Sequence, residues 1–219
     1  RQMCIRDSPD TWNMTYKNGA TWRSADELLA QALRYRTYWK NGGGITVSGG
    51  EPLLQIDFLL DLFKKAKAKG IHTTIDTAGG PFTREEPFFS KFQELMQYTD
   101  LLLVDIKHID EKSHKELTGK TNKNILDMIC FLSDIKKPVW IRHVLVPERS
   151  DYDEYLNRLN DFIQTLDNVE RVEILPYHTL GVHKYEAMEQ EYKLKDVKEN
   201  TPEQLEKAAE VFKEYFTTV

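Results

Sequence analysis

The sequence predicts an α/β protein built on a parallel sheet, because of the order of its segments and their internal spacing. Five short apolar stretches alternate with longer stretches in which apolar residues recur at helical spacing. No internal repeat or low-complexity tract interrupts this alternation, and 219 residues suit one domain. Strands joined through helices form parallel sheets with right-handed connections, so the sheet is either doubly wound or closed toward a barrel.

The stretches that we predict as strands all end in polar, glycine or proline residues. They are 45–48, 72–76, 101–106, 139–146 and 171–175. In parallel α/β folds the ligand lies at the carboxyl ends of the strands, where the loops converge. Polar residues also occur there because the chain must leave the sheet, but acids, bases and glycines at nearly every strand end favour a functional site.

The predicted helices have recognisable start and stop signals. Ser24 is a good N-cap, and Glu27 three residues later completes a capping box. Gly70 is a natural stop for the second helix. The predicted helices are 24–39, 55–69, 122–136, 152–166 and a last one that begins at Thr201-Pro202.

Composition argues against several classes of function. The formal net charge is −5 and the pI is about 5.7, with no basic stripe, which disfavours a nucleic acid as the main partner. The apolar run 101–104 is far too short to span a bilayer, and no charged-then-apolar leader opens the chain. Cys4 and Cys130 cannot build a disulfide framework. We therefore expect a cytoplasmic protein without a membrane partner.

The most unusual stretch is Asn-Gly-Gly-Gly-Ile-Thr-Val-Ser-Gly-Gly-Glu-Pro at 41–52. Its second glycine pair, Gly49 and Gly50, follows a predicted strand, where glycine lets the backbone approach a ligand closely. It is neither a Walker loop nor a dinucleotide fingerprint, because the required lysine and glycine spacings are missing. Taken alone, the pair is equally typical of a tight strand-to-helix turn.

With its neighbours, this stretch resembles the signature of radical S-adenosylmethionine enzymes of the glycyl-radical activating family, of the pyruvate formate-lyase type. The segments that match the family in order are 9–13, 41–52, 70–77, 105–107, 140–142 and 175–181. The resemblance implies a partial (β/α)6 TIM-like barrel of the radical SAM type. Five of its strands would be present here, with the first strand and the cluster loop missing.

The resemblance also implies which residues contact the cofactor, S-adenosylmethionine. They are Gly49, Gly50, Glu51, Asp105, Ile106, Lys107, His108, Ile109 and His178. The first three would lie along the methionine moiety, with the Gly50 backbone at its amino group. Asp105 and Lys107 would face the ribose and carboxylate, and His178 the adenosyl part. A monovalent cation is implied at Asp76, Thr77, Asp105 and the backbone of Leu103.

Several of these residues have other readings. Asp76 and Asp105 could be acids that cap helices after strands. Lys107 alone could be the Schiff-base lysine of a lyase, and the chain could instead be an inactive cofactor-binding fragment. His178 and His183 lack the i, i+4 spacing of a helical zinc pair, which favours a hydrogen-bonded polar histidine. Cys130 lies in an apolar stretch, so we expect a buried core cysteine rather than a ligand.

The sequence departs from the family before Pro9. The family holds a four-iron, four-sulfur (4Fe-4S) cluster with three cysteines spaced C-x3-C-x2-C, and the register places two of them at Met3 and Arg6. Cys4 is out of register. We therefore expect 1–8 to be a leader foreign to the family, 9–219 to be one radical SAM domain, and the chain as written to lack the cluster and its activity.

The function implied for the intact family member is activation of a protein substrate. It would reductively cleave S-adenosylmethionine to a 5′-deoxyadenosyl radical, which abstracts a glycine hydrogen from a pyruvate formate-lyase type glycyl-radical enzyme. A flavodoxin- or ferredoxin-type protein would supply the electron. No extra cysteines occur within 11–24, which favours the formate-lyase type over activases of glycyl-radical dehydratases.

Overall fold

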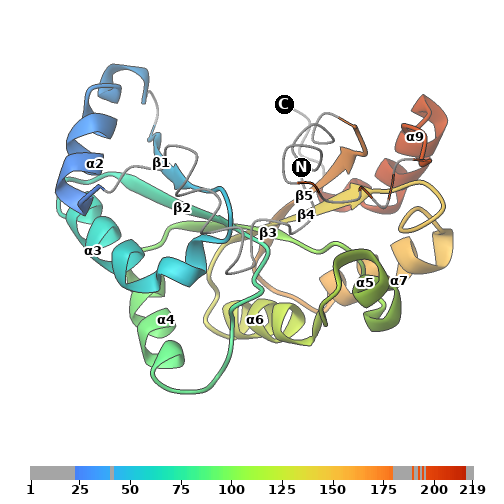
Figure 1. Cartoon of the computed structure of the whole chain (residues 1–219), viewed down its shortest axis with the longest axis horizontal. Helices are drawn as coiled ribbons and strands as arrows, with labels where there is room; N and C mark the ends of the chain where they lie inside the picture. Colours follow the sequence, from blue (N-terminus) through green and yellow to red (C-terminus); the bar gives the residue numbers. More distant parts are fainter. Residues whose placement is uncertain are drawn as a thin grey trace.

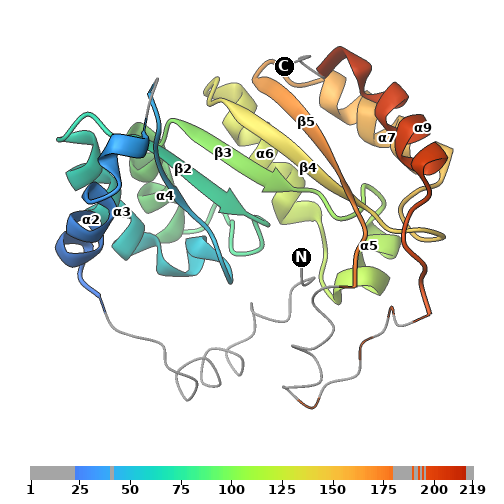
Figure 2. The ribbon, with the colours of Figure 1, turned by 90° about the horizontal axis from the view of Figure 1, so that it is seen from above.

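The computed structural model describes residues 23–39, 42–179, 189, 192, 194 and 196–215. These residues form one five-stranded sheet in the order β1-β2-β3-β4-β5, and every neighbouring pair is parallel. The strands fan out side by side in chain order (Figure 1, Figure 2). They are β1 Gly44–Val47, β2 His72–Thr77, β3 Leu101–Asp105, β4 Val139–Leu145 and β5 Val169–Pro176. The predicted parallel sheet is confirmed, each strand lying within two residues of its expected bounds.

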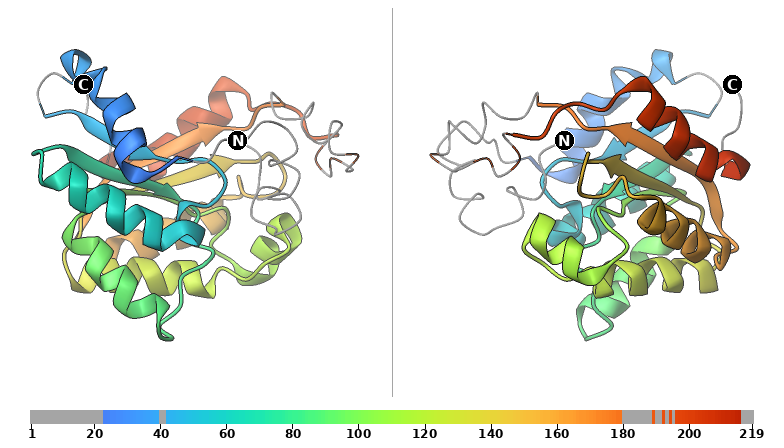
Figure 3. Two further views of the ribbon diagram at one scale, coloured as in Figure 1. Left: turned by 60° about the vertical axis from the view of Figure 1, so that its left-hand side comes forward. Right: turned by 90° about the vertical axis from the view of Figure 1, so that its right-hand side faces the viewer.

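The sheet is open rather than closed, as a partial barrel requires. Within the described residues, β1 pairs only with β2 and β5 pairs only with β4. Helices α3, α4 and α6 run along the same face of the curved sheet (Figure 3). The helices are α2 Ala25–Leu33, α3 Ile56–Lys67, α4 Phe88–Gln97, α5 Glu111–Thr118, α6 Lys123–Asp134, α7 Asp153–Gln164 and α9 Pro202–Val211, with short turns η2 Arg36–Tyr38, η3 Pro52–Gln55 and η4 Lys213–Tyr215.

The predicted helix starts are confirmed by their caps. Ser24 Oγ accepts from the Glu27 backbone N–H at 3.2 Å, and the Glu27 carboxylate accepts from the Ser24 N–H at 2.8 Å. Thr201 forms the same capping box with Gln204 at the start of α9. Each box satisfies two N–H groups that the first helical turn leaves without a partner.

Two sequence expectations about helices need correction. The first helix ends at Leu33 instead of 39, because its buried stripe consists of Ala25 and Leu29 and the aromatic residues beyond it face solvent. Helices α4 and α5 were not expected at all. In α5 the apolar pattern is absent, since its one buried residue is His114.

Gly44 fixes how closely the first two strands approach. A Cβ atom at this position would lie 1.9 Å from the carbonyl oxygen of His72, its partner in the β1–β2 register. Any other residue would force the strands apart, because that contact is with backbone and cannot be relieved by a rotamer change. Glycine at the first position of β1 is therefore required by strand pairing.

The prediction that Cys130 is a buried core residue is wrong. Its side chain is exposed on α6. Ile125, Ile129 and Leu132 are spaced by three and four positions and form the buried stripe of this helix. Residue 130 lies about 100° around the helix from residue 129, on the outward side. An apolar neighbourhood in sequence did not mean burial in a helix.

The described helices include none that is both long enough and apolar enough to cross a membrane.

Candidate functional site

Buried charged residues gather at the carboxyl ends of the strands, where the sequence predicted a site. Glu51 follows β1, Asp76 lies near the end of β2, and Asp105 and Lys107 stand at the end of β3. Each of these side chains belongs to a residue that is less than a tenth exposed. Charged groups are seldom buried unless they are paired or used, so their partners matter.

The loop after β1 combines a glycine turn with a buried carboxylate. Gly49 and Gly50 have φ angles of 91° and 41°, in the left-handed region that favours glycine, and both are exposed. Glu51 then accepts from the Leu53 backbone N–H at 3.0 Å and from the Ala78 N–H at 3.0 Å. The carboxylate caps η3 and ties the β1 loop to the end of β2.

A buried ion pair occupies the end of β3. Lys107 Nζ lies 2.9 Å from Asp105 Oδ2, and the two side chains are 4% and 7% exposed. Removing two charges from water is costly, and a buried pair contributes little net stability. Such a pair is therefore more readily explained by a role in binding than by a role in folding.

A second ion-pair network joins side chains from three strands, β2, β4 and β5. Arg142 on β4 lies 3.1 Å from Asp76 on β2 and 3.4 Å from Glu173 on β5. Arg142 is a residue of this edge for which the sequence predicted no role in the site. The signal was present, since an arginine inside an apolar strand of a parallel sheet requires an acidic partner.

The reading of the two aspartates as helix caps is wrong. Helix α5 is capped by Asp110, whose Oδ1 accepts from the Ser113 N–H at 3.0 Å. Asp105 lies five residues earlier in β3 and pairs with Lys107. Asp76 pairs with Arg142, and the next helix after it begins only at residue 88. Both aspartates therefore pair with cations at the carboxyl edge of the sheet rather than cap helices.

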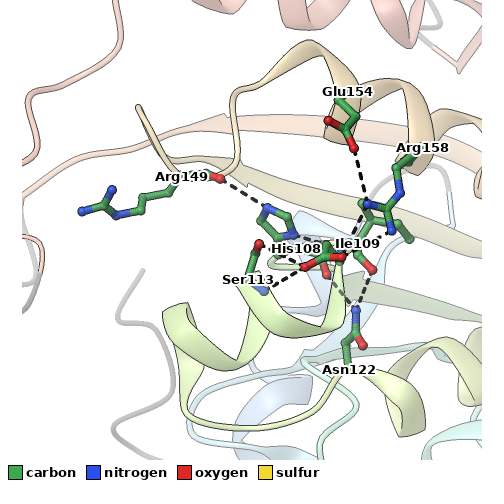
Figure 4. Close-up of polar contacts among 8 residues, drawn as sticks. His108, Ile109, Ser113, Asn122, Arg149, Glu154 and Arg158 are labelled. Atoms are coloured by element: carbon green, nitrogen blue, oxygen red, sulfur yellow. Dashed lines mark hydrogen bonds and ion pairs between the residues drawn. The ribbon is translucent and has the colours of Figure 1, made fainter.

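The loop after β3 is anchored by a hydrogen-bond network (Figure 4). The Nε2–H of His108 donates to the Arg149 carbonyl at 3.2 Å, and its Nδ1 accepts from the Asp110 N–H at 3.0 Å. Asn122 Nδ2 donates to the carbonyls of His108 and Ile109 at 3.0 and 2.9 Å. Burial lowers the pKa of His108, in keeping with the neutral ring that these bonds require.

A second histidine, on the neighbouring strand β4, contacts the same loop. His143 on β4 is fully buried, and its Nδ1 lies 2.8 Å from the carbonyl oxygen of Ile106. Its Nε2 lies 3.4 Å from the Ser150 carbonyl, and burial lowers the pKa of the ring. Ile106 is itself buried, so between them the two histidines hold Asp105 and Lys107 on a rigid backbone.

Three of the predicted site residues line two cavities: Glu51, Lys107 and His178. One, of about 340 Å³, is lined by Glu51 and Lys107 together with residues of α5 and α6. The other, of about 210 Å³, is lined by Arg142, His178 and Tyr192 among others. His178 is exposed, and His183 lies outside the described residues. In the described part of the chain, no group of three His, Cys, Asp or Glu side chains is placed to hold a metal ion.

Comparison with known proteins first identifies the superfamily to which the chain belongs. The family model described as the radical SAM superfamily matches residues 3–162. A crystal structure of a domain of pyruvate-formate lyase-activating enzyme from Bacteroides vulgatus is similar with a TM-score of 0.64 and 26% identity, covering 80% of this chain and 95% of that one. The chain thus belongs to the radical SAM superfamily, and its fold is that of a radical SAM domain.

Two curated relatives narrow the class. The pyruvate formate-lyase-activating enzyme of Listeria monocytogenes is 49% identical over 191 residues, which is 87% of this chain and 76% of the relative. That of Streptococcus mutans is 48% identical over 213 residues, covering 95% and 81%. The chain therefore belongs to the pyruvate formate-lyase-activating enzyme family, and the resemblance found in the sequence is confirmed.

Proposed function

We propose that this chain forms the S-adenosylmethionine-binding barrel of an enzyme that installs a glycyl radical on a pyruvate formate-lyase type protein. The observation that carries the proposal is the buried Asp105–Lys107 pair at the carboxyl edge of the sheet, where Lys107 lines one cavity with Glu51, the residue after the exposed glycine turn. Identity near one half to pyruvate formate-lyase-activating enzymes supports the activity. A cytoplasmic location and a flavodoxin- or ferredoxin-type reductant are parts of the same proposal.

The residues at this edge fit the chemistry of the cofactor. Its ammonium group needs oxygen acceptors, which the backbone at Gly49 and Gly50 can offer without side-chain obstruction. Its carboxylate needs a cation, and Lys107 is held in place by Asp105 at 2.9 Å. His178 and Arg142 line the cavity of about 210 Å³, where the adenosyl part would lie.

The monovalent cation implied at Asp76 and Thr77 is a separate part of the proposal. Asp76 already lies 3.1 Å from Arg142, and the Thr77 hydroxyl donates to Glu51. A cation at this place would therefore share the Asp76 carboxylate with a guanidinium. Titration with K⁺ in a Na⁺-free buffer tests it: binding of S-adenosylmethionine should tighten with K⁺, and unchanged affinity contradicts a cation here.

The cluster does not fit the residues of the printed sequence. A cage of three thiolates is needed, and the sequence holds two cysteines, of which Cys130 is exposed on α6. We therefore infer that the chain as written does not hold the cluster and that its activity depends on cysteines it does not contain. Iron and sulfide reconstitution should give no stoichiometric cluster, and one cluster per chain would refute this.

When bound, the two cofactors supply the reductive cleavage and the removal of a hydrogen atom from the substrate glycine. The contribution of this chain is to bind, orient and shield them. Lys107 and Asp105 would fix one end of S-adenosylmethionine, and His178 the other. The histidines His108 and His143 would keep the β3 loop from shifting.

The decisive experiment supplies the three cluster cysteines. A family N-terminus that ends in Cys-x3-Cys-x2-Cys-His-Asn is joined to Pro9, and the reduced protein is assayed without oxygen. We expect S-adenosylmethionine to be cleaved to 5′-deoxyadenosine and a glycyl radical to appear on pyruvate formate-lyase by electron paramagnetic resonance. A graft that holds a full cluster but yields neither product would rule the proposal out.

The two alternatives predict different results. A Schiff-base lyase would be trapped by borohydride with a ketoacid at Lys107, whereas in the structure this amine is engaged by Asp105. A fragment that only binds the cofactor would retain S-adenosylmethionine in equilibrium dialysis but would give no 5′-deoxyadenosine after the graft. No observation of the described residues favours either alternative.

A further inference from the structure

Tyr177 stands between the end of β5 and His178, which lines the cavity of about 210 Å³. It is 4% exposed and belongs to a small apolar cluster that is separate from the main core. The members of this cluster are Val144, Val146, Tyr177 and Leu194, with Leu117, Leu175, Tyr192 and Val197 packed against them. The carboxyl ends of β4 and β5 are therefore packed against residues that come much later in the chain.

Three hydrogen bonds tie Tyr177 to these later residues. Its hydroxyl lies 3.0 Å from the carbonyl oxygen of Leu194 and 2.6 Å from the hydroxyl of Tyr192. A carbonyl oxygen only accepts, so Tyr177 donates to Leu194 and accepts from Tyr192. The backbone N–H of Tyr177 also donates to Asn200 Oδ1 at 2.8 Å. Tyr192, Leu194 and Asn200 follow Tyr177 by 15, 17 and 23 positions, so tertiary folding rather than local conformation makes these bonds.

Tyr192 also lines the cavity in which the adenosyl part of the cofactor would lie. The other lining residues are on β4, on β5 or in the two positions after β5: Arg142, Val144, Leu175, Pro176, Tyr177 and His178. The sheet fixes the places of these residues, whereas Tyr192 is half-buried and reaches the cavity from outside the sheet. Its hydrogen bond to Tyr177 therefore joins a separate wall of the cavity to the part that is built on the sheet.

We propose that Tyr177 is a positioning residue of the cofactor site, whose hydroxyl holds Tyr192 in place as a wall of the adenosyl cavity. The inference rests on the proposed function. Buried tyrosine hydroxyls normally have a hydrogen-bond partner, so the bond to Leu194 alone would indicate only a structural role. The bond to Tyr192, in contrast, ends on a residue of the cavity itself. A wall that is already in place binds a ligand more tightly, because the ligand does not have to order it.

The first test measures binding of 5′-deoxyadenosine to the full chain by equilibrium dialysis, with circular dichroism to show that each variant is folded. Tyr177→Phe removes the hydroxyl and keeps the ring in the apolar cluster. We expect this variant to bind about fivefold more weakly, which corresponds to the loss of one hydrogen bond. A merely structural hydroxyl would lower stability but not the affinity of protein that remains folded. Equal affinities in a folded variant, or no binding to the unchanged chain, would overturn the proposal.

Tyr192→Phe removes the same tyrosine–tyrosine bond and leaves the bond between Tyr177 and Leu194. It should weaken binding by a similar factor, and the double variant should bind about as weakly as the weaker single variant, because both changes break one interaction. If the two losses multiply in the double variant, the hydroxyls act separately and the proposal is wrong. If Tyr177→Phe does not fold, Tyr192→Phe decides by itself, and an unchanged affinity would overturn the proposal.

Tyr35→Phe is the matched control. It makes the same chemical change at a residue that is 58% exposed and follows α2, which lies on the β1 side of the sheet (Figure 1). Its affinity for 5′-deoxyadenosine should equal that of the unchanged chain, and a loss as large as that of Tyr177→Phe would contradict the assignment to the cavity. None of these measurements involves the cluster or cofactor cleavage. Their failure is therefore distinct from a failure of the grafted protein to yield 5′-deoxyadenosine, which tests the proposed function.

Discussion

The two ends of the sheet each carry a lysine–aspartate pair, and the pairs differ in what they join. At the amino-terminal end, Lys67 lies 2.7 Å from Asp100, and the carboxylate also accepts from the Thr73 backbone N–H at 2.8 Å. This pair connects residues 33 positions apart. At the carboxyl end, Asp105 is the last residue of β3 and Lys107 lies two positions later.

This difference separates a structural role from a functional one. Asp105 and Lys107 are two positions apart in sequence, so their ion pair cannot hold distant segments together. Asp100, in contrast, connects α3, β2 and the start of β3. The carboxyl-end pair is also more deeply buried, at 4% and 7% exposure against 33% and 30%. It bears the larger desolvation cost with the smaller structural gain, which is expected of binding residues.

The largest expected effect is functional. In the grafted protein, replacing both Asp105→Asn and Lys107→Met should weaken S-adenosylmethionine binding by about tenfold or more, because a charged hydrogen-bond partner is lost. The free energy of unfolding should change by only about 1 kcal/mol, since both charges are removed together. Equilibrium dialysis and urea unfolding measure the two quantities. The matched double variant Lys67→Met, Asp100→Asn should bind the cofactor normally, and the reverse pattern would invalidate the comparison.

The next effect concerns the amino-terminal end of β1. Gly44→Val should destabilise the protein by about 3 kcal/mol or more, because its Cβ would meet the His72 carbonyl at 1.9 Å. Gly80→Ala is the control, since a Cβ there would have no atom within 4 Å. Urea unfolding compares the two variants. A Gly44→Val protein as stable as the control would mean that β1 does not pair with β2 as described.

The amino-end pair should make stability depend on pH. Burial by itself would raise the pKa of Asp100, but hydrogen bonds from Lys67 and Thr73 outweigh it and the net pKa is lowered. Its stabilisation is therefore fully present above the unfolded pKa of about 3.9 and is lost as pH falls through the folded value.

The Lys67→Met, Asp100→Asn variant should thus lose about 2 kcal/mol at neutral pH. The gap from the unchanged protein should narrow in acid, because the carboxyl of the unchanged protein is then protonated as well. Thermal or urea unfolding between neutral pH and about pH 3 measures the gap. If the difference in free energy of unfolding between the two proteins stays constant over this pH range, titration of Asp100 does not cause it.

The smallest effect on stability is expected on helix α6, away from both ends of the sheet. Cys130→Ser should change the free energy of unfolding by less than about 0.5 kcal/mol, because the side chain is exposed on α6. Neighbouring protein atoms partly desolvate the thiol, and this together with the nearby Asp127 raises the pKa of Cys130, so its alkylation at neutral pH should be slower than that of a free cysteine peptide. A destabilisation of about 2 kcal/mol would indicate that the Cys130 side chain is buried, as the sequence suggested.

Much of the fold could be predicted because it depends on local patterns. Strand–helix alternation specified a parallel sheet in chain order, and the capping boxes at Ser24 and Thr201 marked two helix starts. Helix α5 could not be predicted, since its buried residue is a histidine and its apolar periodicity is absent. The resemblance supplied the family and the candidate residues at the strand ends, because those motifs are continuous in sequence.

Only the tertiary structure decided which of these groups meet. Arg142 and Asp76 are 66 positions apart, and nothing local in the sequence pairs them. The hydroxyl of Tyr177 meets Tyr192 and Leu194 only in the folded chain, and the exposure of Cys130 depends on which side of α6 faces the sheet. Sequence determines local conformation through short-range sterics and hydrogen bonds, whereas partners depend on how distant segments pack.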